Sequence, residues 1–348
     1  MKITFLIGNG FDLGIGMKSS YKDFYPFYIE KSAKKEEKIK MLSKEISSDY
    51  KTWADFELAL GKYVSKFTKE TAQNLIDQIK DFEKEFMHYL SLQENSLIFD
   101  QNKDLSEHML KALREYYKGD NLPIISMRII EKLYAHHFLE NHTYNFINFN
   151  YTTVLEKCLK TITQGIINKR KRNTEYTDKI GTIIYIHGKC DMNPIIGVND
   201  SNQIDNTELA ENSNFSKYII KPIVNNLLRN ANDSTATEII NTSTIICIYG
   251  MSIGETDKIW WHRILSWLNN NKETQLIVFD YDKDFTQSNH FDRLQKEDAL
   301  IEKLSKYSTK IDVENLRDRI HLAIQKNIFE FDLSDKKSTE ETLEKIHI

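Results

Sequence analysis

Short apolar runs recur along the chain and predict the strands of a buried sheet. They occupy residues 3–7, 144–149, 182–186, 243–249, 275–279 and 327–333. The first run is typical of a parallel strand covered on both faces. Because helical segments separate the runs, we expect an α/β fold with a Rossmann-like, mostly parallel sheet.

The region after the first strand has a different composition and pattern. It is rich in Lys and Glu, and its apolar residues recur at helical spacing. One stripe contains Trp53, Phe56 and Leu60, and the next runs from Leu75 to Leu90. Such stripes are the packing faces of amphipathic helices. We therefore predict a helical insertion subdomain over residues 29–139, after the first strand, and a nucleotide-binding domain formed by residues 1–28 and 140–348.

Two polar stretches and one acidic motif leave alternatives open. Residues 199–216 are dense in Asn, Asp and Ser, which predicts a loop or a mobile lid. The basic run at residues 169–172 is most simply a solvated loop. Asp55 and Glu57 lie two apart beside Trp53. They could reach into a cleft, although acidic residues are also common in the first turn of a helix.

The turn after the first strand is rich in glycine. Gly8, Gly10, Gly14 and Gly16 account for four of the 12 glycines of the chain. A strand that runs into a glycine turn and a helix start is where α/β sheets hold phosphate groups. However, Leu13 stands where the dinucleotide fingerprint G-x-G-x-x-G requires its last glycine, and the P-loop motif is absent from the sequence. The turn therefore predicts either a nucleotide site or close packing of a helix on the sheet.

Three later strand ends are also polar. Asn150 and Thr152 follow the second predicted strand, His187 precedes a glycine after the third, and Asp257 closes a Gly-Ser loop after the fourth. The Asn and Thr could be plain helix caps, and Asp257 could bind a ribose or cap a helix. A His at the end of a buried strand is a candidate for proton transfer. Polar residues at four strand ends together favour a ligand site at one edge of the sheet.

Composition narrows the class of protein. The 348 residues carry a formal net charge of −4 with a pI near 6.2, which does not favour nucleic acid as a partner. The three cysteines lie far apart, which supports neither a disulfide framework nor a zinc site. Apolar runs are too short for a membrane span, and the first residues lack the pattern of a signal peptide. We expect a soluble, cytoplasmic protein without a metal.

Six motifs occur in an order that identifies a family resemblance. They are G-N-G-F-D at 8–12, S-Y-K-D-F at 20–24, W-A-D-F-E at 53–57, F-N-Y-T at 149–152, H-G at 187–188 and G-M-S-I-G-E-T-D at 250–257. This set resembles the AbiH family of bacterial abortive-infection proteins, which act against phage. The family in turn looks like a distant relative of the sirtuin-like domains of defence NAD hydrolases.

The resemblance implies roles for individual residues. Asn150 matches the catalytic amide and His187 the general base. The implied nucleotide-binding residues are Gly8, Asn9, Gly10, Phe11, Asp12, Tyr21, Phe24, Tyr151, Thr152, Gly250, Ser252 and Asp257. Two positions depart from the sirtuin pattern, because Thr152 stands in place of an Asp and Asp12 in place of a small residue. The four cysteines of the sirtuin zinc module are also missing, which argues against deacetylation.

The expected function is hydrolysis of the nicotinamide–ribose bond of NAD in antiphage defence, with NAD as substrate rather than as a resident cofactor. The expected partners are NAD or a related nucleotide, further copies of this chain, and a phage-derived trigger that the sequence does not identify. The alternative is a nucleotide-binding sensor or scaffold without turnover, whose helical insertion binds a partner protein. A nuclease would need clustered metal-binding carboxylates, and the strand ends offer His and Asn instead.

Overall fold

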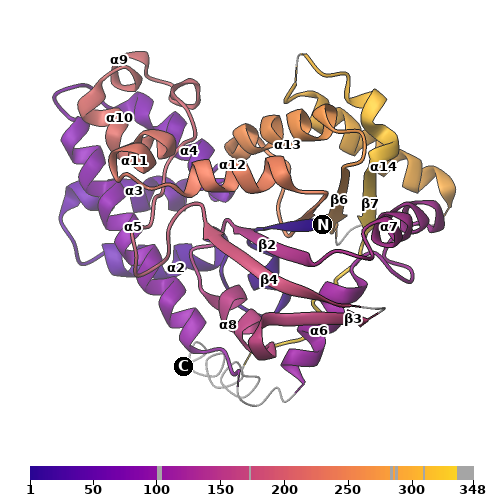
Figure 1. Cartoon of the computed structure of the whole chain (residues 1–348). Helices are drawn as coiled ribbons and strands as arrows, with labels where there is room; N and C mark the ends of the chain where they lie inside the picture. The colour runs from indigo at the N-terminus through magenta and orange to yellow at the C-terminus, as the bar shows by residue number, and fades with distance from the viewer. Residues whose placement is uncertain (100–103, 172–173, 283–284, 287–288, 309, 335–348) are drawn as a thin grey trace.

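A seven-stranded sheet forms the centre of the computed structural model, which describes residues 1–99, 104–171, 174–282, 285–286, 289–308 and 310–334 (Figure 1). The strands are β1 (Lys2–Ile7), β2 (His142–Asn148), β3 (Ile166–Lys171), β4 (Glu175–Tyr185), β5 (Ile245–Tyr249), β6 (Gln275–Asp280) and β7 (Ile320–Ile324). Their order is β3-β4-β2-β1-β5-β6-β7, and every pair is parallel except β3 with β4. The prediction of a mostly parallel α/β sheet is confirmed.

Fourteen α-helices surround this sheet in the described part of the chain. They are α1 (Gly10–Gly14), α2 (Tyr21–Ser32), α3 (Glu37–Ser48), α4 (Phe56–Tyr63), α5 (Ala72–Asn95), α6 (Leu105–Glu115), α7 (Ile124–His136), α8 (Val154–Lys160), α9 (Thr207–Ala210), α10 (Ser213–Ile219), α11 (Lys221–Leu227), α12 (Asn232–Thr242), α13 (Lys258–Asn270) and α14 (His290–Ser305). Two apolar cores separate them into layers. One core joins α12, α13 and α14 to one sheet face, and the other joins α6, α7 and α8 to the opposite face.

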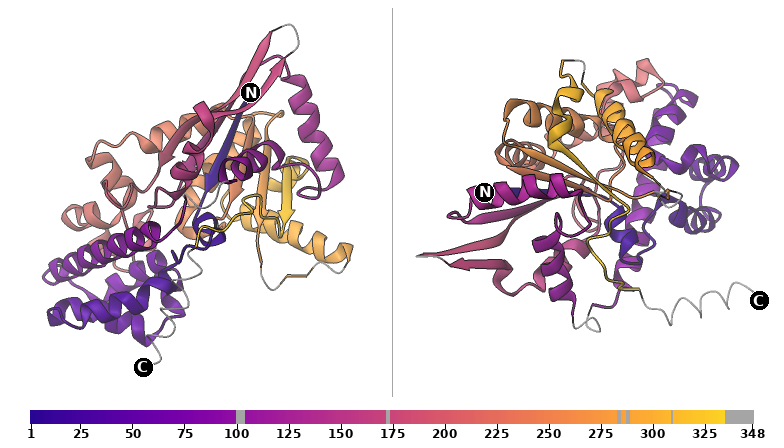
Figure 2. Two further views of the ribbon diagram at one scale, coloured as in Figure 1. Left: turned by 90° about the horizontal axis from the view of Figure 1, so that it is seen from below. Right: turned by 90° about the vertical axis from the view of Figure 1, so that its right-hand side faces the viewer.

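Helices α2 to α5, which lie between β1 and β2 in the chain, extend beyond the sheet and pack mainly on one another. Figures 1 and 2 show α2 to α5 gathered at one end of the molecule. Helices α9 to α11, which come from the β4–β5 connection, lie beside them in Figure 1, and α10 contacts α5. The helical end therefore contains chain from both sides of the predicted boundary at residue 139.

Aromatic side chains hold the helical end together. Phe56 of α4 and Phe82 of α5 stack with ring centroids 3.8 Å apart, and both are fully buried. Phe24 of α2 packs edge-on against Phe82, with centroids 5.2 Å apart. Leu75 and Leu90 are buried on the same α5 face. The apolar stripes in the sequence are therefore packing faces, as predicted.

The last strand is not where the sequence suggested. Residues 327–333 form no strand, and the seventh strand is the earlier run β7. The alternating apolar residues of 327–333 pack on α1 instead, where Phe329 meets Phe11 edge-on with centroids 5.0 Å apart. Leu333 is tied to Ile15 and Ile98 by backbone hydrogen bonds. An alternating pattern was thus satisfied by packing on a helix instead of pairing in a sheet.

The predicted loop at 199–216 is largely helical and includes a short 3-10 helix at Ser201–Gln203 as well as α9 and the first part of α10. The prediction was wrong because its Asp and Asn residues are caps. Asp200, Asn206 and Asn212 each accept a hydrogen bond from a backbone N–H in the first turn of the helix that follows.

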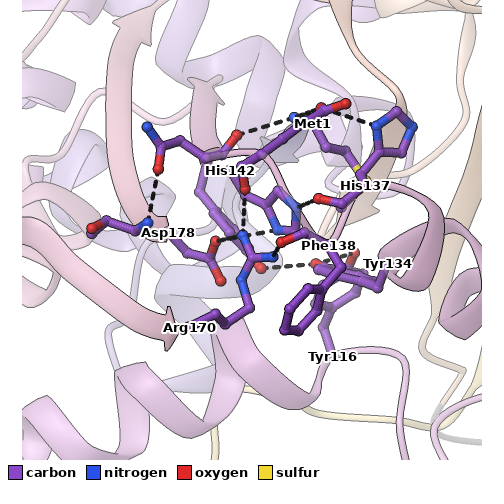
Figure 3. Close-up of polar contacts among 12 residues, drawn as sticks. Met1, Tyr116, Tyr134, His137, Phe138, His142, Arg170 and Asp178 are labelled. Carbon is purple, nitrogen blue, oxygen red and sulfur yellow. Dashed lines mark hydrogen bonds and ion pairs between the residues drawn. The ribbon is translucent and has the colours of Figure 1, made fainter. Parts of the chain in front are cut away.

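The basic run at residues 169–172 also differs from the predicted loop, because Lys169, Arg170 and Lys171 belong to β3, while Arg172 lies outside the described residues. Arg170 reaches the buried Asp178 of β4 at 2.7 Å, and His142 of β2 contacts the same carboxylate at 3.2 Å (Figure 3). Burial lowers the pKa of His142. This group joins three strands at the start of β2, away from the strand ends discussed next.

Candidate functional site

Apart from Tyr21 and Phe24, which belong to α2, the predicted site residues follow the ends of β4, β2, β1 and β5, which are neighbours in the sheet. From β1 the next strand in the chain is β2, its neighbour in one direction across the sheet. From β5 the next strand is β6, its neighbour in the opposite direction. In open α/β sheets, ligands bind outside the carboxyl ends of the strands at such a change of direction. The turns after β1 and β5 occupy this position.

These two glycine turns contact each other directly. The N–H of Gly8 donates to Tyr249 O at 3.0 Å, and the N–H of Gly10 donates to Gly250 O at 2.8 Å. Gly250 has φ +67°, and a Cβ on Gly10 would lie 2.5 Å from the Gly250 Cα. Glycine is therefore required here for the close approach of two turns, a packing role that differs from the predicted packing of a helix on the sheet.

Asn150 ties the end of β2 to this pair of turns. Its side-chain amide donates to Gly8 O at 3.1 Å, and its backbone N–H donates to the side chain of Asn148 at 3.1 Å. Asn148 is fully buried, and its Nδ2 has no hydrogen-bond partner among the described residues. The predicted catalytic amide thus lies next to an unpaired donor.

Asp12 and Thr152 form a second link across the same strand ends. The Thr152 hydroxyl donates to Asp12 Oδ2 at 2.6 Å, whereas Oδ1 of the same carboxyl has no partner in the described part of the chain. Burial raises the pKa of Asp12 to about 7, although the bond from Thr152 lowers it. The two departures from the sirtuin pattern therefore contact each other.

His187 lies beside Asn150 on the neighbouring strand end. β2 and β4 pair through Asn148 and Tyr185, and His187 and Asn150 each come two residues later. The His187 ring meets Phe149 edge-on with centroids 5.7 Å apart. Its Nδ1 is buried without a partner in the residues described, and burial, then the charge of Lys221, keep its pKa well below the usual value. The imidazole is therefore neutral at neutral pH.

A buried ion pair lies next to these groups. Lys221 of α11 contacts the carboxylate of Glu57 of α4, with exposed side-chain fractions of 3% and 12%. Burial raises the pKa of Glu57 to about 7, Lys221 opposes this shift, and the charge of Asp257 adds to it. Burial also raises the pKa of Asp257. Acidic groups with raised pKa values are frequent at functional sites.

Lys221 was not predicted from the sequence. For Asp55 and Glu57, two explanations were left open: a place in a cleft or in the first turn of a helix. Asp55 is a helix cap that accepts from the Leu58 N–H at 3.2 Å, so the ordinary explanation holds for that residue. Glu57 instead faces the protein interior. No local pattern identifies Lys221, because its position depends on a partner far away in the chain.

The remaining predicted residues divide between the site and the core. Tyr151 is buried and donates to Ile195 O at 3.0 Å, and the half-buried Tyr21 stacks on Phe86 with centroids 4.8 Å apart. Burial raises the pKa of both tyrosines. The charge of Glu57 adds to this shift in both, and Tyr151 adds to it in Tyr21. Of the other four, Asn9 accepts a hydrogen bond from the Ser19 hydroxyl, Phe11 and Phe24 are buried in the core, and Ser252 is exposed.

A surface hollow of about 410 Å³ lies elsewhere, between α7 and α14, with Ile125, Ile129 and Leu300 in its wall. We place the site at the strand ends nevertheless, because three of the unpaired buried polar atoms and several groups with shifted pKa values lie at neighbouring strand ends there. Within the residues that the structure covers, His, Cys, Asp and Glu form no cluster of three suited to a metal ion. Among the described helices, none combines the length and the apolar character that crossing a membrane requires.

Comparison with known proteins agrees with the motif order. Residues 4–281 match the family model described as Bacteriophage abortive infection AbiH. A search of curated proteins finds no match. The matched segment runs from β1 to the residue after β6 and includes all the site residues described above. The chain therefore belongs to the AbiH family of bacteriophage abortive infection proteins.

Proposed function

We propose that this protein hydrolyses the nicotinamide–ribose bond of NAD during abortive infection. The observation that carries the proposal is the gathering of unpaired buried polar atoms at one edge of the sheet. Asp12 Oδ1, Asn148 Nδ2 and His187 Nδ1 come from three different strand ends and have no partner among the described residues. Leaving a buried polar group unpaired costs about 1–3 kcal/mol, so a ligand or water that satisfies these atoms is the simplest reason for keeping them.

The chemistry suits these groups. Nicotinamide leaves as a neutral ring from a cationic glycosidic bond, so cleavage needs no acid to protonate the leaving group. It requires a ribose held in a reactive position and a base for water or a ribose hydroxyl. Asn150 orients the ribose and water, and the neutral His187 serves as a hydrogen-bond acceptor and base towards a ribose hydroxyl. The turns at Gly8 and Gly250 receive the pyrophosphate.

The family supplies the biological setting. Abortive infection requires that an infected cell stop supporting phage growth, and loss of NAD would achieve this in the cytoplasm, where we place the protein. A phage-derived trigger and assembly of several copies of this chain complete the proposal. Regulation of this kind keeps the enzyme silent in uninfected cells.

Nicotinamide release tests the proposal directly. Purified protein is incubated with NAD alone, and then with an extract of phage-infected cells that supplies the trigger. The expected result is stoichiometric release of nicotinamide and ADP-ribose in at least the second reaction, and loss of that release in the Asn150→Ala protein. NAD that persists in both reactions, and in infected cells protected by the protein, would reject hydrolysis.

Binding without turnover is the second candidate, and one observation favours it. The Asn150 amide is bonded to Gly8 O, and the Gly10 N–H is bonded to Gly250 O. These groups already form hydrogen bonds within the protein. In this alternative they maintain the shape of the nucleotide site and do not act on the bound molecule. In that case NAD binds and is recovered intact.

A further inference from the structure

The ion pair between Glu57 and Lys221 joins two parts of the molecule at the site. Glu57 is in the first turn of α4, within the helices between β1 and β2, and Lys221 is the first residue of α11, in the β4–β5 connection. Both side chains are largely removed from solvent, yet Glu57 keeps 12% of its side-chain surface exposed. Removing paired charges from water seldom adds stability, so such a pair needs a reason other than folding.

Rigid elements fix both partners. The Lys221 N–H donates to Val198 O at 2.9 Å, immediately after the parallel bridge between Val198 and Ile220. On the other side, the Asp55 cap fixes the start of α4, and Phe56 is locked against Phe82. The carboxylate is therefore held in one place in the absence of substrate, as a catalytic group must be.

The surroundings of Glu57 connect it to the predicted catalytic residues. The ring centroid of Tyr21 lies 5.3 Å from that of Phe56, the neighbour of Glu57, and 4.8 Å from that of Phe86. The ring centroid of Tyr151 lies 6.1 Å from that of Phe86 and 6.2 Å from that of His187. The charge of Asp257, at the N-cap of α13, adds to the raised pKa of Glu57. Glu57 is therefore joined to His187 through a continuous group of aromatic rings, and it keeps slightly more exposed surface than His187, which is 6% exposed.

On the basis of the proposed function, we infer that Glu57 is a further catalytic residue, which accepts the proton of the attacking water while Lys221 holds its carboxylate in position. The water oxygen forms a bond to the ribose C1′, and the bond from C1′ to the nicotinamide nitrogen breaks. Its electron pair stays on the ring, which leaves as neutral nicotinamide. The water proton passes to Glu57 and then to solvent, and His187 accepts a hydrogen bond from a ribose hydroxyl.

The basicity of the two groups supports this assignment. The pKa of His187 lies well below its usual value because of burial and Lys221, so the imidazole is a weak base. The pKa of Glu57 is about 7, because burial outweighs the effect of Lys221 and because Asp257 and Asp55 add negative charge. A general base is most effective when its pKa lies near the working pH.

The test is the pH dependence of kcat/KM for NAD cleavage, with nicotinamide release as the assay and the same trigger extract if one is needed. For the wild type we expect the acid limb near pH 7. Glu57→Gln is expected to lower kcat/KM by a factor of about 10²–10⁴ and to remove that limb. Lys221→Met should move the limb to higher pH, because Lys221 favours the charged carboxylate. Asp55→Asn keeps a capping side chain and should retain most of the rate.

Folding is controlled with the double variant Glu57→Gln/Lys221→Met, which removes both charges of the pair together, so that neither partner is left behind alone. It should unfold at a temperature close to that of the wild type yet remain inactive. If Glu57→Gln keeps the wild-type rate and acid limb, or if the wild-type limb lies well below pH 6.5, Glu57 is not the base, while hydrolysis itself stands. If the wild type releases no nicotinamide, the proposed function fails and this inference falls with it.

Discussion

The hydroxyl of Thr152 donates a 2.6 Å hydrogen bond to the carboxylate of Asp12, and this bond joins the end of β2 to the helix that follows β1. Both side chains are about 1% exposed. The pair therefore confines an ionisable group to a place where water cannot stabilise its charge. Burial raises the pKa of Asp12 from 3.8 to about 7.

Replacing Asp12 by Asn should change how stability depends on pH. The folded protein binds the Asp12 proton more tightly than the unfolded chain, so this group lowers the free energy of unfolding as pH rises from about 4 to 7. Asp12→Asn removes that loss. The difference in free energy of unfolding between variant and wild type should therefore shift in favour of the variant by on the order of 4 kcal/mol from pH 4 to pH 8. Chemical unfolding of both proteins at the two pH values measures it. An equal effect at both would contradict the shifted pKa.

Removing the predicted catalytic side chains should separate activity from folding. His187→Ala and Asn150→Ala are each expected to reduce NAD cleavage by a factor of about 10²–10⁴ and to abolish protection against phage. Asn150→Ala also leaves Gly8 O without its donor, which should lower the free energy of unfolding by about 1–3 kcal/mol. Phage plating and a thermal melt are the measurements. Full protection by a folded variant would remove the enzymatic interpretation.

The contact between the two glycine turns predicts a large cost for a single methyl group. A Cβ at Gly250 would lie 2.7 Å from Phe11 N, at φ +67°. Gly250→Ala should therefore lower the free energy of unfolding by roughly 2–5 kcal/mol. Gly119→Ala is the matched control, because φ there is +63° but no other described atom lies within 4 Å, and it should cost only about 1 kcal/mol. Similar losses for both would show that crowding is unimportant.

The aromatic core of the helical end offers a test of its packing. Phe82 is fully buried and stacks on Phe56, so Phe82→Ala should lower the free energy of unfolding by about 3–5 kcal/mol. Leu92 is in the same helix but is 46% exposed, and Leu92→Ala should change stability by less than about 1 kcal/mol. Urea unfolding compares them. A small effect at Phe82 would mean that the helical end contributes little to cooperative folding.

The sequence predicted the parts of the fold that local pattern controls. β1, β5 and β6 were found because buried parallel strands are apolar over several residues, and α5 because its stripe has helical period. β3 was missed because Lys169 and Lys171 are exposed at the edge of the sheet, while the burial of Arg170 depends on its partner Asp178 on another strand. The segment at 199–216 was misinterpreted since Asn and Asp favour helix caps and loops alike.

The site was predicted only as far as its residues follow strands. Asn150 and His187 could be placed at one sheet edge because parallel strands end together. Lys221 could not, because a Lys before Pro222 is locally an ordinary helix start. Lys221 is buried against Glu57, which lies in a distant part of the chain. A contact between distant residues leaves no hydrophobic period or motif spacing in the sequence.

Val198 and Ile220 are held together by a parallel bridge, so the chain between them leaves and returns at one point. The chain between these two residues packs inward, because Leu209 and Phe215 are buried and Gln203 donates to Glu255 O at 3.0 Å. Lys221 comes immediately after Ile220. A substitution in this buried segment should therefore be transmitted through the bridge to Lys221, so the β4–β5 connection couples the packing of the helical end to the ion pair with Glu57.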